Sequence, residues 1–120
     1  MEFHENAPIF LQIADRLADE ILAGKYAVDS RIPGVREYAV LLEVNLNTVV
    51  KSYDLLASRD VIYNKRGLGY FVSPQAPEVI HAERKTAFLT SDLPEIVRKM
   101  QQLGITVDEV ADRLRQLASG

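Results

Sequence analysis

The chain has 120 residues, of which 48% are hydrophobic and 26% are charged, with a formal net charge of -3 at pH 7 and no cysteine. This composition is ordinary for a globular domain, and the lack of cysteine excludes disulfides, thiolate catalysis and cysteine-based zinc sites. No apolar run approaches the about 20 residues of a membrane span. The first residues also lack the charged-then-apolar pattern of a signal peptide, so we expect a cytoplasmic location.

Apolar residues recur at helical spacing in the first part of the chain and predict an amphipathic helix over about residues 8–23. Gly24 can end this helix in the left-handed conformation. The polar side chains of this helix, Glu20 among them, indicate a solvated face. After a connection, Pro33 precedes a second predicted helix over about residues 34–42.

A third predicted helix follows a turn over residues 43–47. Val49, Tyr53 and Leu56 recur at helical spacing and predict its buried face. The residues that fall largely away from this face are polar, namely Asn47, Thr48, Lys51 and Ser52.

Short polar side chains at the start of a helix suit insertion into the major groove of DNA. Asn can bond base edges or phosphates, Thr can contact a phosphate or a thymine methyl group, and Lys can neutralise a phosphate. The alternative is that Asn45, Asn47 and Thr48 only cap the helix, which is the commoner role for each residue alone. Because a hairpin follows this helix at once, the combination favours DNA binding.

Two short runs of strand-forming residues predict a β-hairpin; the first ends near Lys65 and the second begins near Tyr70. Lys65 and Arg66 fall at its tip, where they can reach a phosphate or the minor groove, and Gly67 gives the turn its backbone freedom. Three helices followed by a hairpin indicate a winged helix-turn-helix. The fold class is therefore mainly α with a small β-hairpin.

The distribution of charge is less favourable to DNA binding. Residues 1–75 carry eight Lys or Arg and ten Asp or Glu, whereas residues 44–70 carry four basic and two acidic residues. DNA-binding domains often have a basic excess, although affinity depends on the face presented to phosphates. A winged-helix module for protein-protein contact, without sequence-specific DNA binding, is therefore an alternative interpretation.

Residues 73–77 contain two prolines and predict a stiff, extended linker between an N-terminal domain, residues 1–75, and a helical segment, residues 76–120. Two or three helices are expected in that segment. Pro94 leaves open whether the first part is kinked there or split near Ser91.

Gly104 can end one helix of the segment, and Thr106 with Glu109 forms a capping box that opens the last. No catalytic pattern is present. Neither His4 nor His81 has a second ligand at helical spacing, and phosphate-loop and nucleophile-elbow motifs are absent. We therefore expect no enzyme, no cofactor and no metal site.

Four motifs, in order and at matching spacing, resemble the N-terminal domain of the GntR family of bacterial transcription regulators. They are PIFLQI from Pro8, IPGVRE from Ile32, VNLNTV from Val44 and RGLGYFV from Arg66. The Asn-x-Asn-Thr-Val element and the short C-terminal segment are most similar to the YtrA branch of this family.

The resemblance implies a homodimeric repressor that binds an inverted-repeat operator, and it allows a small-molecule effector. It implies that Arg36 reads bases and that Lys51 contacts a phosphate. Asn45, Asn47 and Thr48 would begin the recognition helix, and Arg66 with Gly67 would form the wing tip.

Some residues depart from the family pattern. Val28-Asp29 stands where a Pro-Gly pair is usual, and Gly34 stands where a Ser is frequent. Leu46 and Val50 occupy positions that carry Arg in other branches. Base reading should therefore depend on Arg36, the Asn residues and DNA shape.

The C-terminal helices are too small to enclose a core of their own. Their apolar faces must pack on the N-terminal domain, on a second copy of the chain, or on both. We expect a dimer, because a symmetric operator requires two reading heads at a fixed separation. The predicted interface comprises Leu89, Leu93, Ile96, Val97, Met100, Leu103, Val110, Leu114 and Leu117.

Overall fold

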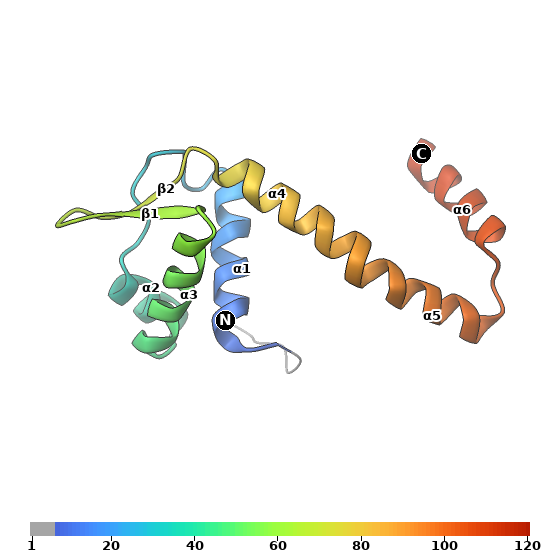
Figure 1. Cartoon of the computed structure of the whole chain (residues 1–120), viewed down its shortest axis with the longest axis horizontal. Coiled ribbons are helices and arrows are strands. Elements are labelled where there is room, and N and C mark those ends of the chain that lie inside the picture. The colour runs from blue at the N-terminus through green and yellow to red at the C-terminus, as the bar shows by residue number, and fades with distance from the viewer. Residues whose placement is uncertain (1–6) are drawn as a thin grey trace. The chain divides into compact units, whose positions relative to one another are not determined.

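The computed structural model describes residues 7–120 and contains two compact units, Met1–Ala82 and Glu83–Gly120. Its mainly helical fold with one antiparallel hairpin confirms the predicted fold class (Figure 1). The elements are α1 (Ile9–Leu22), α2 (Val35–Leu42), α3 (Leu46–Ser58), β1 (Ile62–Lys65), β2 (Gly69–Val72), α4 (Ala76–Ala87), the π-helical turn η1 (Phe88–Asp92), α5 (Leu93–Leu103) and α6 (Val107–Ser119).

The core of the first unit forms where α1, α2 and α3 bury their apolar faces. Leu17 of α1 and Val49 of α3 are fully buried there, and Leu42 of α2 is nearly so. Burying one stripe of α3 turns the opposite stripe to solvent, because side chains repeat every 3.6 residues. The core thereby determines which residues of α3 are exposed.

Two buried tyrosines join the helices through their hydroxyl groups. The Tyr53 hydroxyl donates to the Pro33 carbonyl at 2.6 Å, and the Tyr38 hydroxyl donates to the Glu20 carboxylate. Burial raises the pKa of both tyrosines, because a phenolate would lose its hydration. The prediction that Glu20 is solvated is wrong: its side chain is 13% exposed, and it also pairs with Lys25 at 2.9 Å.

The predicted exposure of Ser52 is also wrong. Ser52 is fully buried, and its Oγ donates to the Phe10 carbonyl of α1 at 2.7 Å, with the Thr48 carbonyl 3.0 Å away. A small residue at this position lets α1 and α3 approach closely. Its hydroxyl satisfies a backbone carbonyl of α1 at the contact.

The hairpin has a third backbone partner in the connection that precedes α2. β1 and β2 pair with Ile62 opposite Val72 and Lys65 opposite Gly69. The Val72 N–H donates to the Ser30 carbonyl at 3.0 Å, and the Val72 carbonyl accepts the Asp29 N–H at 2.8 Å. A lone two-stranded hairpin is marginally stable, so this added pairing helps to hold the wing.

The predicted extended linker over residues 73–77 is wrong. A tight turn follows β2, the Ala76 N–H donates to the Ser73 carbonyl at 3.0 Å, and α4 begins at once. Pro77 lies in the first turn of α4, where its missing N–H is not needed. Ala76 and Ile80 are buried in the core, so the start of α4 belongs to the first unit.

In the second unit, the backbone passes through η1 into α5 without leaving the helical region. The helix is therefore not split near Ser91, and a π-helical turn precedes Pro94. The Leu93 N–H donates to the Phe88 carbonyl, a π-helical bond, immediately before the proline that cannot donate. Gly104, with φ of 68°, ends α5 as predicted, and the Thr106–Glu109 capping box opens α6 as predicted.

Ser52 and Ser58 offer a matched test of the α1–α3 contact, since both serines lie on α3 and only Ser52 bonds across helices. We expect Ser52→Ala to lower the free energy of unfolding by about 1 kcal/mol, because the hydroxyl bond between the two helices is lost. Ser58→Ala should change it by less than about 0.5 kcal/mol. Urea denaturation measures both, and equal effects would contradict the proposed importance of the Ser52 bond.

Candidate nucleic-acid interface

The start of α3 contains a helix-capping residue and exposed polar side chains. Asn45 is the N-cap residue, and its Oδ1 accepts the Asn47 N–H at 2.8 Å, so the capping interpretation is confirmed for Asn45. The Asn47 side chain is exposed and that of Thr48 is half-buried. The Asn45 side chain is exposed too, and its amide nitrogen takes no part in the capping bond.

Lys51 lies one turn further along α3, and its Nζ is 4.0 Å from the centre of the Phe10 ring. This cation–π contact limits where the ammonium group can move while leaving it exposed to solvent. The role of Phe10 could not be predicted from the sequence, because residues 41 positions apart give no local signal of contact. Phe10 therefore joins the residues that shape this surface.

Arg36 is exposed on the first turn of α2, next to Glu37. Glu37 supports this helix end, because its Oε1 accepts the Gly34 N–H at 3.3 Å. A shallow hollow lined by Arg36 and Leu46, among others, connects α2 with the start of α3. Arg36 thus borders the exposed start of the third helix.

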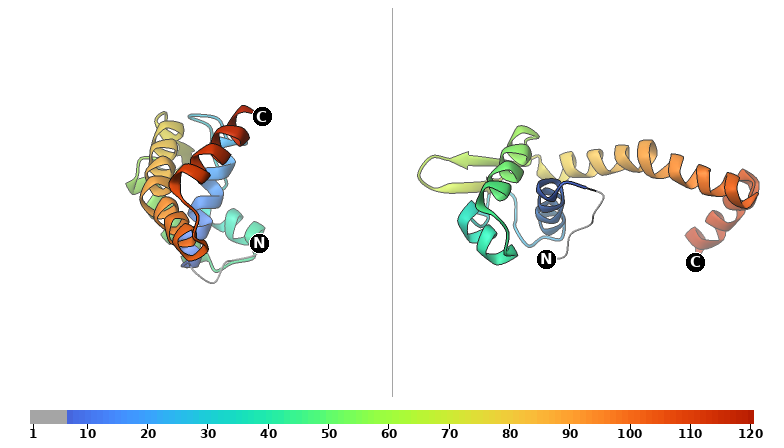
Figure 2. Two further views of the ribbon diagram at one scale, coloured as in Figure 1. Left: turned by 90° about the vertical axis from the view of Figure 1, so that its right-hand side faces the viewer. Right: turned by 90° about the horizontal axis from the view of Figure 1, so that it is seen from below.

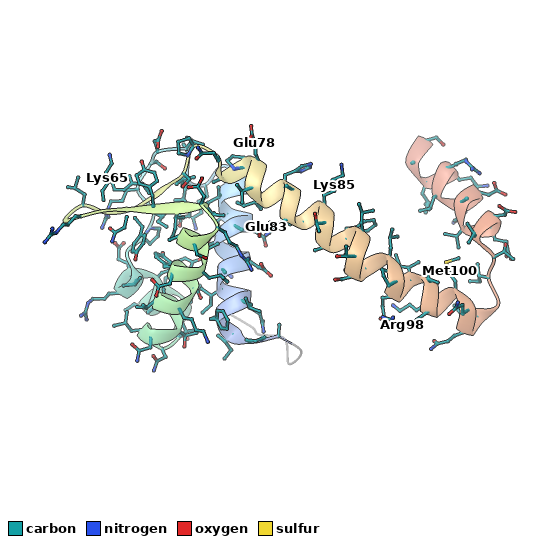
Figure 3. All side chains as sticks on the ribbon, viewed as in Figure 1. Lys65, Glu78, Glu83, Lys85, Arg98 and Met100 are labelled. Atoms are coloured by element: carbon teal, nitrogen blue, oxygen red, sulfur yellow. The ribbon has the colours of Figure 1, made fainter. Side chains whose placement is uncertain are left out.

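The wing carries exposed Lys65, Arg66 and Gly67 at the end of the hairpin. Lys65 projects from the hairpin, with its Nζ 4.9 Å from the centre of the Phe71 ring (Figure 3). Gly67 has φ of 81°, a conformation that suits glycine in this turn. The two cations and the turn therefore lie together at the tip.

At the base of the wing, Asp29 stands where the resemblance to the GntR family implied a glycine. Its φ of 62° is left-handed, which Asp tolerates better than most residues. The Tyr63 hydroxyl donates to Asp29 Oδ1 at 2.9 Å, and this bond raises the pKa of Tyr63. Asp29 thus combines a left-handed backbone conformation with a side-chain contact to β1.

In Figure 1 and Figure 2 the hairpin extends away from α1, and α2 lies beside α3. Arg36, the start of α3 and the wing cations are therefore carried on neighbouring elements. Lys51 differs, since it contacts Phe10 near the start of α1.

Among residues 7–120, no group of three or more His, Asp or Glu side chains is arranged to hold a metal ion. His81 is exposed on α4, and His4 lies outside the described residues. In the same range, no helix combines the length and apolar character needed to cross a bilayer.

Comparison with known proteins gives a family match over residues 10–72, to "Bacterial regulatory proteins, gntR family". The chain is 25% identical to the HTH-type transcriptional repressor YtrA of Bacillus subtilis, covering 95% of this chain and 87% of the relative.

Solved structures agree with that match. A GntR-family putative transcriptional regulator from Bacteroides thetaiotaomicron is 46% identical, with a TM-score of 0.79 and coverage of 93% of this chain and 97% of that one. The DNA-binding domain of AraR, solved in complex with its operator, is 26% identical, with a TM-score of 0.55 and coverage of 61% and 88%.

The capping bond at Asn45 predicts a difference in stability between two neighbouring amides. We expect Asn45→Ala to lower the free energy of unfolding by about 1 kcal/mol, because the first turn of α3 loses its side-chain acceptor. Asn47→Ala, at an exposed position, should change it by less than about 0.5 kcal/mol. Thermal and urea denaturation measure the difference, and a neutral Asn45→Ala would show that the cap contributes little.

Proposed function

Because this chain belongs to the GntR family of bacterial regulatory proteins, we propose that it represses transcription by binding an inverted-repeat operator as a homodimer. The observation that carries the proposal is the set of exposed polar and basic side chains on α2, the start of α3 and the wing. The repressor name of YtrA and the operator complex of AraR support it.

In this proposal, the start of α3 enters the major groove. Asn47 and Thr48 contact base edges there, while Asn45 uses its amide nitrogen and keeps its oxygen on the Asn47 N–H. Arg36 reads bases from the neighbouring helix, because a guanidinium can bond a guanine in bidentate fashion. Leu46 is half-buried beside Arg36. It offers the DNA an apolar contact at a position that carries Arg in other branches of the family.

The remaining contacts fix the position of the protein on the duplex. Lys51 bonds a phosphate, with the Phe10 ring limiting its range of motion. Lys65, Arg66 and the backbone at Gly67 contact the adjacent minor groove or phosphates from the wing. Few cations take part, so sequence-dependent DNA shape contributes to specificity.

We propose residues 76–120 as the dimerisation segment, apart from the buried start of α4. No side chain of residues 83–120 is buried, although many are apolar. Ile96, Leu103 and Leu114, for example, are 39%, 71% and 59% exposed. Fully burying such a side chain contributes about 1.5–3 kcal/mol, so a second copy would gain stability here. The full proposed interface is Leu89, Leu93, Ile96, Val97, Met100, Leu103, Val110, Leu114 and Leu117.

In this proposal the chain works in the cytoplasm and catalyses no reaction, and its activity is open to control by a small-molecule effector of unidentified class. The alternative, a winged-helix module for protein contact, is favoured by the net charge of -3. Binding to DNA distinguishes the two functions.

Substitution of Arg36 and Lys51 separates base reading from phosphate contact. The probe is a duplex selected from a random library by the wild-type chain. We expect Arg36→Ala to weaken binding and relax sequence preference at one position by about 1–3 kcal/mol, whereas Lys51→Ala weakens all sequences alike and reduces the salt slope by about one. Gel shifts at several salt concentrations measure both effects. Undiminished specific binding by Arg36→Ala would contradict base reading, and failure to select any duplex would favour the alternative function.

The proposed dimer predicts a response to charge in the C-terminal helices. We expect Ile96→Glu and Leu114→Glu each to produce monomers at micromolar concentration, because a buried unpaired carboxylate is costly. Gln102→Glu, at an exposed polar position of α5, is the matched control and should leave the dimer intact. Sedimentation velocity reports the mass, and a wild-type monomer at that concentration would rule the dimer out.

A further inference from the structure

Arg31 lies in the connection before α2, where no recognition motif points to it. Its backbone forms an antiparallel bridge with Phe71 of β2. Its side chain runs along the hairpin, and Nε donates to the Leu68 carbonyl in the wing turn at 3.1 Å. A residue 37 positions earlier in the chain thus holds the turn that carries Arg66 and Gly67.

The same guanidinium also reaches the start of α2. Arg31 Nη1 is 3.7 Å from Glu37 Oε1, and that oxygen accepts the Gly34 N–H. A continuous set of contacts therefore joins the wing turn at Leu68 to the first turn of α2. Arg36 is the residue next to Glu37.

Gly69 provides the space for this arrangement. Its φ of 107° disfavours other residues, and a Cβ atom built there would lie 3.0 Å from Arg31 Nε. Such a distance is tighter than ordinary van der Waals contact. The lack of a side chain at residue 69 therefore lets the guanidinium cross the start of β2.

The contacts of Arg31 are suited to local order more than to global stability. The Arg31 and Glu37 side chains are 54% and 63% exposed, and an exposed ion pair contributes little to folding. The bond to the Leu68 carbonyl is charge-assisted and directional. Loss of either contact should therefore free the wing turn while leaving the core folded.

We propose that Arg31 is a positioning residue of the DNA interface, which fixes the wing turn relative to the start of α2 so that Lys65, Arg66 and Arg36 meet the duplex in a set geometry. This inference rests on the proposed DNA-binding function. A direct phosphate contact by Arg31 is the competing explanation, and the experiments below distinguish the two.

The first experiment needs no DNA. Arg31→Lys keeps the charge but removes the Nε–H donor, so amide hydrogen exchange at residues 66–69 of the free chain should accelerate roughly two- to tenfold, as for loss of one hydrogen bond. Exchange at Val49 in the core should not change. Wild-type exchange in the wing turn would overturn the proposal, whether or not the chain binds DNA.

The second experiment measures affinity for the selected duplex by fluorescence anisotropy. Arg31→Lys and Arg31→Ala should each weaken binding by roughly two- to tenfold in the native wing, on the same hydrogen-bond scale. In a Lys65→Ala/Arg66→Ala background the loss should be less than about twofold, because coupled residues are not additive. Two results would indicate a direct contact and overturn positioning. One is wild-type affinity in Arg31→Lys with weakened affinity in Arg31→Ala, and the other is an equal loss of affinity in the native wing and in the Lys65→Ala/Arg66→Ala background. If no duplex is selected, the proposed function fails, and the exchange experiment still decides whether Arg31 holds the turn.

Discussion

The packing of α3 against α1 is the constraint on which the candidate interface depends. Val49, Ser52 and Tyr53 are fully buried on one stripe of α3. The Ser52 bond to the Phe10 carbonyl resists sliding between the helices, and the Tyr53 bond to Pro33 ties α3 to the segment that leads into α2. With that stripe fixed, helical geometry turns Asn47 and Lys51 toward solvent.

The wing depends on the same framework. Residues 29–32 pair with β2 before the chain enters α2, so one short segment connects the hairpin with the helix that carries Arg36. A chain with net charge of -3 gains little from general attraction to DNA. In the proposed function its affinity comes from a few cations held in place, so the contacts of Phe10 with Lys51 and of Arg31 with Leu68 matter more than they would in a strongly basic domain.

The features predictable from the sequence are those with local causes. Helical periodicity predicted the first three helices. Gly104 predicted the end of α5, the Thr106 capping box predicted the start of α6, and the alternating runs predicted the hairpin.

The errors have long-range causes. Ser52 and Glu20 are polar residues satisfied by partners from other elements, and local pattern assigns such residues to the surface. Pro77 was interpreted as part of an extended linker, yet its ring fits the first turn of a helix that Ala76 and Ile80 anchor in the core. Arg31 gave no signal at all, because its partners lie in the wing turn and on α2.

In the proposed function, the start of α2, the start of α3 and the wing form one DNA-binding surface. Amide chemical shifts recorded while the full chain is titrated with the selected duplex test it most directly. We expect the largest changes in residues 34–37, 45–51 and 65–68, and we expect them to saturate together, because the three segments engage one ligand as a unit. Changes concentrated in residues 83–120, with those three segments unaffected, would contradict this DNA-binding surface.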